Sequence, residues 1–455
     1  MIFIIFLIGL INIILFKNNP KKLVFYLLIL FPYFGLIEFF LRDLTVIHPI
    51  FFDFTFIIPI YFLYFFTQNY KSNYLELKKI TIFIVFYILL HTVYMLTPNN
   101  PYPFLGRLIG LKVWVFYLFI IYIGFYYLET EEDFKKIINV LSIGVIAPCI
   151  ILIIQYSVAT IYGYEYAFFL IDAINEVPTD ISRPGYSIFN LGPIKVFRLN
   201  STFSSVTELT NYLIFSFVPV ITALHLNNEK KYLLLNKLAL ILLIIASFIC
   251  GARSMFLFIP ILLFLYILFK KGFKIFSLYF IFFILISTLF YQYNVLYLQN
   301  FVADYYPLFI GYKNMVTSGF GNFLINNFWG NGVGSATGEV RFLFKVDYTT
   351  DPASLAVYER YYYKILYETG FIGLISYIFI AFKFISYPIG LLNKSTNELY
   401  KSFASISLSF LIFVFYIFAL KGFSIDLFPI SFMKFFLIGL ILKINFLINN
   451  KLNNI

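Results

Sequence analysis

Cysteine, histidine and charged residues are scarce in this sequence, and each scarcity excludes a class of protein. The 455 residues include two cysteines and three histidines. Cys149 and Cys250 both lie inside apolar runs, where small buried hydrophobes are expected, so we predict neither a disulfide nor a metal site. Only 12% of the residues are charged and 61% are hydrophobic, including 62 Phe and 38 Tyr. A soluble domain of this size does not need so much apolar surface.

Apolar runs long enough to cross a bilayer, about 20 residues each, recur along the chain. We therefore expect an all-α, polytopic transmembrane bundle of about 13 spans, forming a single integral membrane domain over residues 1–455. The first run has no basic n-region and no small-residue cleavage site, so we interpret it as a retained span. The expected spans are residues 1–16, 23–41, 50–66, 80–97, 108–128, 137–157, 208–226, 238–252, 254–269, 275–291, 366–392, 402–420 and 427–447.

The distribution of lysine predicts the orientation. Short loops on one side of the expected bundle carry eighteen cations, all lysine, whereas short loops on the other side carry four: Arg42, Arg107, Arg253 and Lys421. Because cations in short loops stay in the cytoplasm, we expect the N-terminus outside and the C-terminus inside. Because these lysines are explained by membrane orientation, the formal charge of +11 does not indicate nucleic-acid binding. The eighteen are Lys17, Lys21, Lys22, Lys71, Lys78, Lys79, Lys135, Lys136, Lys230, Lys231, Lys237, Lys270, Lys271, Lys274, Lys394, Lys401, Lys443 and Lys451.

Arginine is confined to the outer side. Two long segments, residues 158–207 and 292–365, interrupt the spans, and both fall outside in this topology. Every arginine lies in, or at the edge of, an outward-facing segment. Its planar fork of donors matches phosphate and carboxylate better than lysine does, so we expect an anionic, phosphate-bearing substrate on this side. The arginines are Arg42, Arg107, Arg183, Arg198, Arg253, Arg341 and Arg360.

The exit of the first long segment gathers a cation, hydroxyl groups and a carboxylate. Arg198 lies shortly before the span at 208–226, Ser201 and Thr202 follow it, and Glu208 lies at the mouth of the span. Such a group at a membrane surface would suit the binding of phosphate and sugar.

The same stretch also has a structural interpretation. Ser204 or Ser205 would cap the N-terminus of the following helix, with Glu208 favourable in its first turn. The cap leaves Arg198 unexplained.

A second arginine lies in a four-residue break, Gly-Ala-Arg-Ser, between two apolar runs. An arginine at membrane depth costs free energy, so Arg253 in this position indicates a functional role. Snorkelling to the interface is the alternative. Lysine would snorkel equally well, and this chain uses lysine almost everywhere else.

The second long segment is rich in glycine and tyrosine. Its glycines, including Gly330, Gly332 and Gly334, lack a following Lys-Ser/Thr and so form no P-loop. They predict ordinary turns, with a mobile anion cradle as the alternative. The tyrosines of this segment, Tyr358 and Tyr362 among them, suit either an interfacial belt or stacking against sugar rings.

A few ionisable residues lie inside the expected spans and lean to the outer side. Glu38, Asp53 and Lys112 lie near outer ends, Lys434 lies about a third of the way in, and Lys383 is the exception. Such residues are costly in a membrane. They indicate either a polar cavity open to the exterior or pairing that stabilises the bundle.

The order of these motifs resembles the O-antigen polymerase and ligase family. An R-x-x-(S/T) stretch with a Phe just after it opens a span, an (S/A)-R dipeptide lies between two spans, a long outer loop contains G-x-G, and an E-x-x-Y to E-x-G-x-x-G stretch opens the next span. These stretches are Arg198 to Phe203, Ala252 to Ser254, Gly332 to Gly334, and Glu359 to Gly373, within residues 108–392. The resemblance implies a glycosyltransferase that needs no metal or other cofactor and acts on polyprenyl-diphosphate-linked glycans at the outer face of the bacterial inner membrane.

One departure from the family pattern favours the polymerase branch. The ligase branch carries a histidine in the large outer loop, and residues 292–365 contain none. An arginine usually found early in that loop is also missing, with Lys313 nearby.

The resemblance therefore implies polymerisation of repeat units into a surface polysaccharide of the O-antigen type. Arg198 and Arg253 match the functional arginines of the family and would stabilise charge on the leaving diphosphate. Arg360 is a third candidate, and Glu359 or Glu368 would accept the proton of the acceptor. The expected partners are undecaprenyl-diphosphate-linked donor and acceptor glycans and the lipid bilayer, with a chain-length regulator left open.

Candidate substrate-binding residues complete the expected site: Ser201, Thr202, Glu208, Tyr358 and Tyr362. Three alternatives remain. A ligase would transfer the polymer to lipid A core. A flippase or other transporter would instead carry internal repeats and short loops. A non-catalytic scaffold is opposed only by the arginine distribution.

Overall fold

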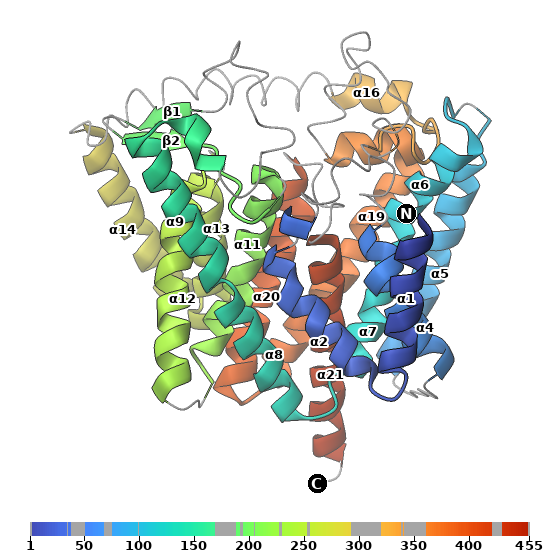
Figure 1. Cartoon of the computed structure of the whole chain (residues 1–455), viewed down its shortest axis with the longest axis horizontal. Helices are drawn as coiled ribbons and strands as arrows, with labels where there is room; N and C mark the ends of the chain where they lie inside the picture. Colours follow the sequence, from blue (N-terminus) through green and yellow to red (C-terminus); the bar gives the residue numbers. More distant parts are fainter. Residues whose placement is uncertain are drawn as a thin grey trace.

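The described part of the chain folds into one helical bundle with a single β-hairpin at one end (Figure 1). The computed structural model describes residues 2–33, 35–37, 51–67, 75–98, 100–168, 188–191, 194–203, 205–226, 230–252, 255–292, 320–337, 340, 361–420 and 430–453. Statements about structure below concern these residues.

Apolar sequence and the placement of proline and capping residues set the bounds of the helices. Pro20 begins a helix at its first position, where no N–H is lost. Thr130 begins another through a capping box with Asp133. The α-helices are α1 (Ile2–Phe16), α2 (Pro20–Leu30), α4 (Ile58–Phe62), α5 (Leu75–Met95), α6 (Phe104–Val115), α7 (Ile120–Tyr127), α8 (Glu131–Gly144), α9 (Ile146–Ile161), α11 (Val206–Ala223), α12 (Lys230–Ile249), α13 (Met255–Lys271), α14 (Phe273–Gln292), α16 (Phe320–Asn326), α19 (Tyr361–Lys394), α20 (Glu398–Ile412) and α21 (Ile430–Asn453).

Short irregular elements connect or extend these helices. The strands β1 (Ile188–Leu191) and β2 (Ile194–Phe197) pair antiparallel, with Ile188 opposite Phe197. The 3₁₀ and π segments are η1 (Phe31–Tyr33), η3 (Asp53–Ile57), η4 (Leu63–Thr67), η5 (Phe116–Phe119), η6 (Tyr164–Phe168), η9 (Phe413–Ile417) and η10 (Phe418–Leu420).

Eight helical segments among the described residues are long and apolar enough to cross a membrane, so the chain is a helical multi-pass membrane protein. This confirms the expected all-α membrane fold, whereas the count of 13 spans and the orientation stay predictions. The eight segments are Leu75–Met95, Phe104–Tyr127, Glu131–Ile161, Val206–Ala223, Tyr232–Ile249, Tyr361–Lys394, Glu398–Ile417 and Ile430–Asn449. The shorter apolar helices are Ile5–Phe16, Asp53–Phe66 and Phe273–Leu285.

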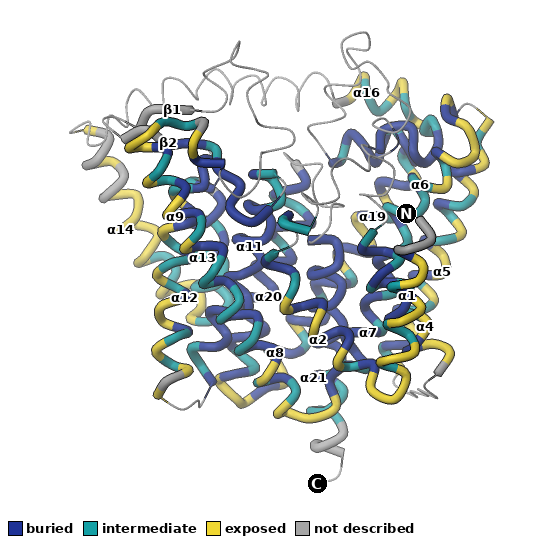
Figure 2. Tube along the Cα trace, in the orientation of Figure 1, coloured by how far each residue is buried: buried dark blue, intermediate teal, exposed yellow. Residues whose placement is uncertain are grey.

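The centre of the bundle is formed by α11, α20 and α21. Helix α11 is buried along nearly its whole length, whereas α12 and α14 expose large apolar side chains at the flank (Figure 2). Exposed apolar surface of this extent belongs against lipid rather than water. Helices α7 and α21 cross closely because Gly124 and Gly439 meet; a Cβ on Gly439 would lie 2.8 Å from the Gly124 Cα.

Both long segments have their described parts at the same end of the bundle. The β1–β2 hairpin of the first and α16 of the second lie at one end, and the C-terminus lies at the other (Figure 1). We call these the hairpin end and the C-terminal end. Lys394, at the end of α19, donates to the Asn449 side chain near the end of α21 (3.2 Å), which places this lysine at the C-terminal end.

Candidate functional site

The segment that follows Arg198 turns from the hairpin into the bundle. Arg198 comes directly after β2 and is half-buried, and residues 199–203 are fully buried. The Tyr164 hydroxyl donates to the Arg198 carbonyl oxygen (2.8 Å), and the Tyr164 ring stacks on Phe197. The Leu199 N–H donates to the Cys250 carbonyl oxygen (3.3 Å). The backbone of Arg198 is therefore fixed on both sides.

Ser201 and Thr202 hold this segment from within. The Ser201 N–H donates to Gln155 Oε1 (2.8 Å), and its hydroxyl donates to the Pro148 carbonyl oxygen (2.6 Å). The Thr202 hydroxyl donates to the carbonyl oxygen of Pro32. Ser201 has φ of +54°, a conformation that costs free energy in a residue with a Cβ and persists only when its surroundings enforce it. Both hydroxyls face protein rather than an open site.

A glycine brings the two arginine-bearing segments together. Gly251 follows α12 with φ of +72°, and a Cβ there would lie 2.7 Å from the Arg198 Cα and 2.5 Å from the Phe197 carbonyl carbon. Only glycine allows so close an approach. The break after α12 is thus pressed against the residue that carries the first arginine. Arg253 follows two residues later in sequence and itself lies outside the described residues.

The start of α11 lies beside this contact. Ser205 is its N-cap and accepts a hydrogen bond from the Glu208 N–H (3.3 Å), which confirms the predicted cap at this position. Ser204 lies outside the described residues. Glu208 is half-buried in the first turn of α11, where an acidic side chain interacts favourably with the positive end of the helix dipole.

The glycines of the second long segment form a fixed turn. Gly330, Gly332 and Gly334 have φ of +73°, +97° and +93°. A Cβ on Gly330 would lie 2.6 Å from the Gly370 nitrogen, and one on Gly334 would lie 2.9 Å from the Gly106 carbonyl oxygen. These close backbone contacts confirm the prediction of turns over residues 330–337, and they leave no room for a mobile cradle there.

Glu368 fastens this turn to the bundle. Its buried carboxylate accepts hydrogen bonds from Trp114 Nε1 (2.6 Å), the Ala336 N–H (2.8 Å) and the Thr337 hydroxyl (2.9 Å). Its carbonyl oxygen accepts from the Gly332 N–H (2.9 Å). The three donors therefore satisfy this buried side chain.

The sequence-based prediction did not include Trp114 and Lys364, two residues near Glu368. Trp114 lies 5.2 Å from the buried Lys364 ammonium, measured from the ring centroid. Lys364 and Glu368 are four residues apart on one helix face, and this spacing is the sequence signal that would have predicted them to be neighbours. A small cavity of about 20 Å³, large enough for one water molecule, lies beside Trp114 and the buried Lys434.

Tyr362 has a structural partner. Its hydroxyl donates to the Phe415 carbonyl oxygen (2.9 Å) in η9, where the π-helical backbone departs from the regular hydrogen-bonding pattern. The remaining candidates, Arg360, Glu359 and Tyr358, lie outside the described residues.

Two ion pairs among the described residues lie inside the bundle. Lys112 Nζ lies 2.7 Å from Asp53 Oδ2, and Lys383 Nζ lies 3.4 Å from Glu76 Oε2. The Tyr117 hydroxyl also donates to Asp53 (3.1 Å). These contacts confirm the pairing alternative for Asp53 and Lys112. Glu38 lies outside the described residues.

Arg107, one of the arginines expected on the outer side, has a role that needs no substrate. Arg107 donates through its guanidinium to the carbonyl oxygens of Tyr102 (2.8 Å), Asn100 (3.0 Å) and Thr97 (3.2 Å). It thereby organises the connection between α5 and α6. Location on the outer side alone therefore does not identify a substrate-binding arginine.

Comparison with known proteins adds no family assignment: no family model and no curated protein matches the chain. The resemblance to the O-antigen polymerase and ligase family therefore rests on the sequence motifs. To these the structure adds the contact between Arg198 and Gly251 and the anchoring of the turn at residues 330–337 by Glu368.

Proposed function

We propose that the protein is a membrane glycosyltransferase that polymerises polyprenyl-diphosphate-linked oligosaccharide repeat units into a surface polysaccharide. The observation that carries this proposal is the backbone contact between Arg198 and Gly251, which joins two sequence-distant segments that each supply an arginine. A diphosphate site needs two guanidinium groups that can reach one point, because each offers a planar pair of donors. In the orientation proposed from the lysines, the hairpin end faces the outside of a bacterial inner membrane.

In the proposed reaction, an acceptor sugar hydroxyl attacks the anomeric carbon of the donor glycan. The bond from that carbon to the diphosphate oxygen breaks, and undecaprenyl diphosphate leaves with the electron pair. Arg198 and Arg253 stabilise the negative charge that develops on the leaving oxygens, with Arg360 as a third candidate. The acceptor proton passes to a carboxylate, for which the sequence offers Glu359 and Glu368.

The described contacts refine the set of residues in this proposal. Ser201 and Thr202 shape the segment behind Arg198, and Glu368 positions the turn at residues 330–337 against α6 and α19. We therefore assign these three residues to positioning rather than to contact with substrate. Tyr362 is assigned to packing against η9.

Arg198→Lys and Arg253→Lys test this function in a deletion strain complemented with each variant. Lysine keeps the charge and loses the planar fork, so each variant is expected to abolish most polymerisation at normal protein abundance. A loss of about 3 kcal/mol in transition-state stabilisation slows turnover by about two orders of magnitude. The polysaccharide ladder on a gel measures the effect.

Arg183→Lys is the matched control, because Arg183 lies in the first long segment outside the motifs. It should give a wild-type ladder. Wild-type ladders from both Arg198→Lys and Arg253→Lys would refute the proposed site. Long polymer that accumulates on undecaprenyl diphosphate in the deletion strain would identify a ligase instead.

A further inference from the structure

A pocket of about 690 Å³ opens between α13, α19 and α20, at the other end of the bundle from Arg198 and Gly251. Its walls come from the end of α13, the end of α19 and one face of α20 along its length. Lys394, next to the pocket residue Asn393, contacts Asn449, so the pocket lies at the C-terminal end of the bundle. It is therefore separate from the proposed polymerisation site at the hairpin end.

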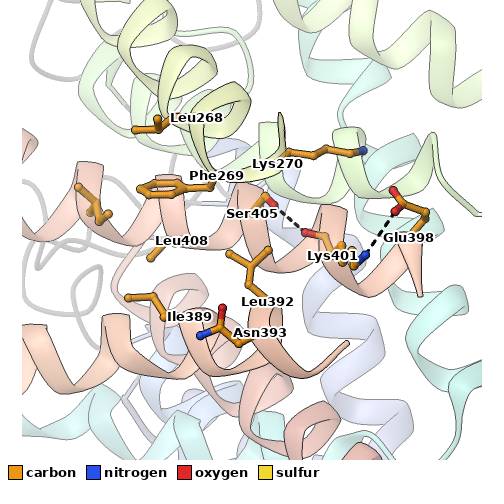
Figure 3. A pocket seen from close by; sticks show the side chains of 11 residues that line it. Leu268, Phe269, Lys270, Ile389, Leu392, Asn393, Glu398, Lys401, Ser405 and Leu408 are labelled. Atoms are coloured by element: carbon orange, nitrogen blue, oxygen red, sulfur yellow. Dashed lines mark hydrogen bonds and ion pairs between the residues drawn. The ribbon is translucent and has the colours of Figure 1, made fainter. Parts of the chain in front are cut away.

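One side of the pocket is polar and carries net positive charge. Lys270 and Lys401 lie there with Glu398 (Figure 3). The Lys401–Glu398 pair is long, at 3.7 Å, and both side chains are largely exposed, so this pair is weak. Lys270 is held in place: its ammonium donates to Ser402 Oγ (3.3 Å) and contacts His225 Nε2. The pocket thus presents one positioned and one adaptable ammonium group.

The opposite side of the pocket is apolar. Leu268, Phe269, Ile389 and Leu408 line it (Figure 3), and Ile412 extends it along α20 toward the middle of the bundle. The polar groups lie at the helix ends and the apolar groups lie deeper, the same order as the headgroup and chains of a lipid.

The pocket is continuous with a surface that faces the bilayer. Ile389 is 42% exposed and lines the pocket, and Phe382, seven residues earlier on the same face of α19, is 67% exposed. A molecule from the membrane can therefore reach the pocket sideways, without passing through water.

We propose that this pocket binds an anionic glycerophospholipid. The lipid phosphate lies between the ammonium groups of Lys270 and Lys401, and an acyl chain lies along Ile389, Leu408 and Ile412. Charge complementarity selects an anionic over a zwitterionic headgroup, since a basic residue near a membrane surface contributes about 1 kcal/mol toward anionic lipid. The proposal is independent of the polymerase function, because binding is a property of the purified protein.

Lipid titration of the purified full-length protein in detergent tests the site, with thermal unfolding as the readout. Phosphatidylglycerol is expected to raise the unfolding midpoint more than phosphatidylcholine at equal concentration, because a ligand of the folded state stabilises it. Lys270→Gln and Lys401→Gln should each weaken the apparent affinity for phosphatidylglycerol about fivefold. Lys401 is only partly buried, so its variant remains informative even if Lys270→Gln folds poorly.

Lys22→Gln is the matched control, because Lys22 is an exposed lysine of α2 outside the pocket. It should leave the affinity unchanged. Ile389→Trp fills the apolar half, keeps both lysines, and should also weaken binding. Inorganic phosphate alone should not shift the midpoint. Equal stabilisation by phosphate or by phosphatidylcholine, or full binding by the Ile389→Trp variant, would overturn the proposal.

Discussion

At the scale of single residues, the buried Glu368 side chain shows how a polar group can hold the architecture of a membrane protein together. Three donors from α6 and from the turn at residues 330–337 converge on it. Buried hydrogen bonds are expensive to break, because the group left unpaired cannot bond to water instead. The side chain thus ties α19 to a segment more than thirty residues earlier in the chain.

Glu368→Gln should destabilise the protein. The new NH₂ group would face either the Trp114 N–H or the donors at Ala336 and Thr337, leaving a buried donor unpaired at a cost of about 1–3 kcal/mol. Thermal unfolding of the purified protein measures the loss. Thr337→Val removes one donor and should cost less. Unchanged stability together with lost polymerisation in Glu368→Gln would show that Glu368 acts as the base, as the sequence-based hypothesis had it.

His225 makes stability depend on pH. Burial lowers the pKa of His225. The Lys270 ammonium contacts His225 Nε2, and its positive charge also lowers this pKa. The hydrogen bond to the Ile221 carbonyl oxygen and the charge of Glu398 oppose this lowering of the pKa, and Lys271 adds to it. The folded protein therefore binds the proton less readily than the unfolded chain, whose histidine titrates near pH 6.5. The stabilising contribution is present above about pH 6.5 and is lost as pH falls toward the lowered pKa.

Unfolding midpoints at about pH 7.5 and about pH 5.5 test this dependence. The wild type should lose more stability over this interval than His225→Gln, in which a neutral acceptor faces Lys270 at every pH. Parallel losses in both proteins would assign the pH dependence to other groups.

At the scale of elements, the contact of β2 with the break after α12 is the feature on which the proposed site depends. Gly251→Ala should disrupt it, because the new Cβ would collide with the backbone of Phe197 and Arg198 and because φ is +72°. A strained residue of this kind costs about 1–3 kcal/mol. We expect reduced stability and a large loss of polymerisation.

Gly390→Ala is the matched control for this substitution. Gly390 lies inside α19, and a Cβ there meets no heavy atom within 4 Å. Alanine in a helix interior should be neutral or should stabilise the protein by up to about 1 kcal/mol. If Gly251→Ala behaves like Gly390→Ala, the close approach does not determine the position of Arg198.

Features encoded locally were predictable from the sequence, and those that depend on tertiary packing were not. The Ser205 cap follows from local chemistry and was predicted. The span expected at 137–157 lies within the apolar helical segment Glu131–Ile161, but the break between α8 and α9 at Val145 was not predicted. Pro148, in the first turn of α9, has no N–H to donate to the preceding turn. The bond from Leu199 to Cys250 joins residues about fifty positions apart, and no periodicity indicates it.

At the scale of the whole molecule, the two ends of the bundle have different chemistry. The hairpin end carries the contact between Arg198 and Gly251 and the turn at residues 330–337. The C-terminal end carries the pocket with Lys270 and Lys401. If the lysine distribution reports orientation, the hairpin end is outside and the lipid pocket lies in the inner leaflet. Both proposals place an anionic, phosphate-bearing molecule against the protein, on opposite sides of the membrane.

Cysteine labelling in intact cells tests this orientation. Lys345→Cys places a thiol in the second long segment, and Lys451→Cys places one near the C-terminus. The native Cys149 and Cys250 are buried, so the wild type gives the background. A membrane-impermeant maleimide should label position 345 in intact cells and position 451 only after the inner side is exposed. The reverse pattern would put the arginines in the cytoplasm, where a polymerase that uses outward-facing lipid-linked glycans has no substrate.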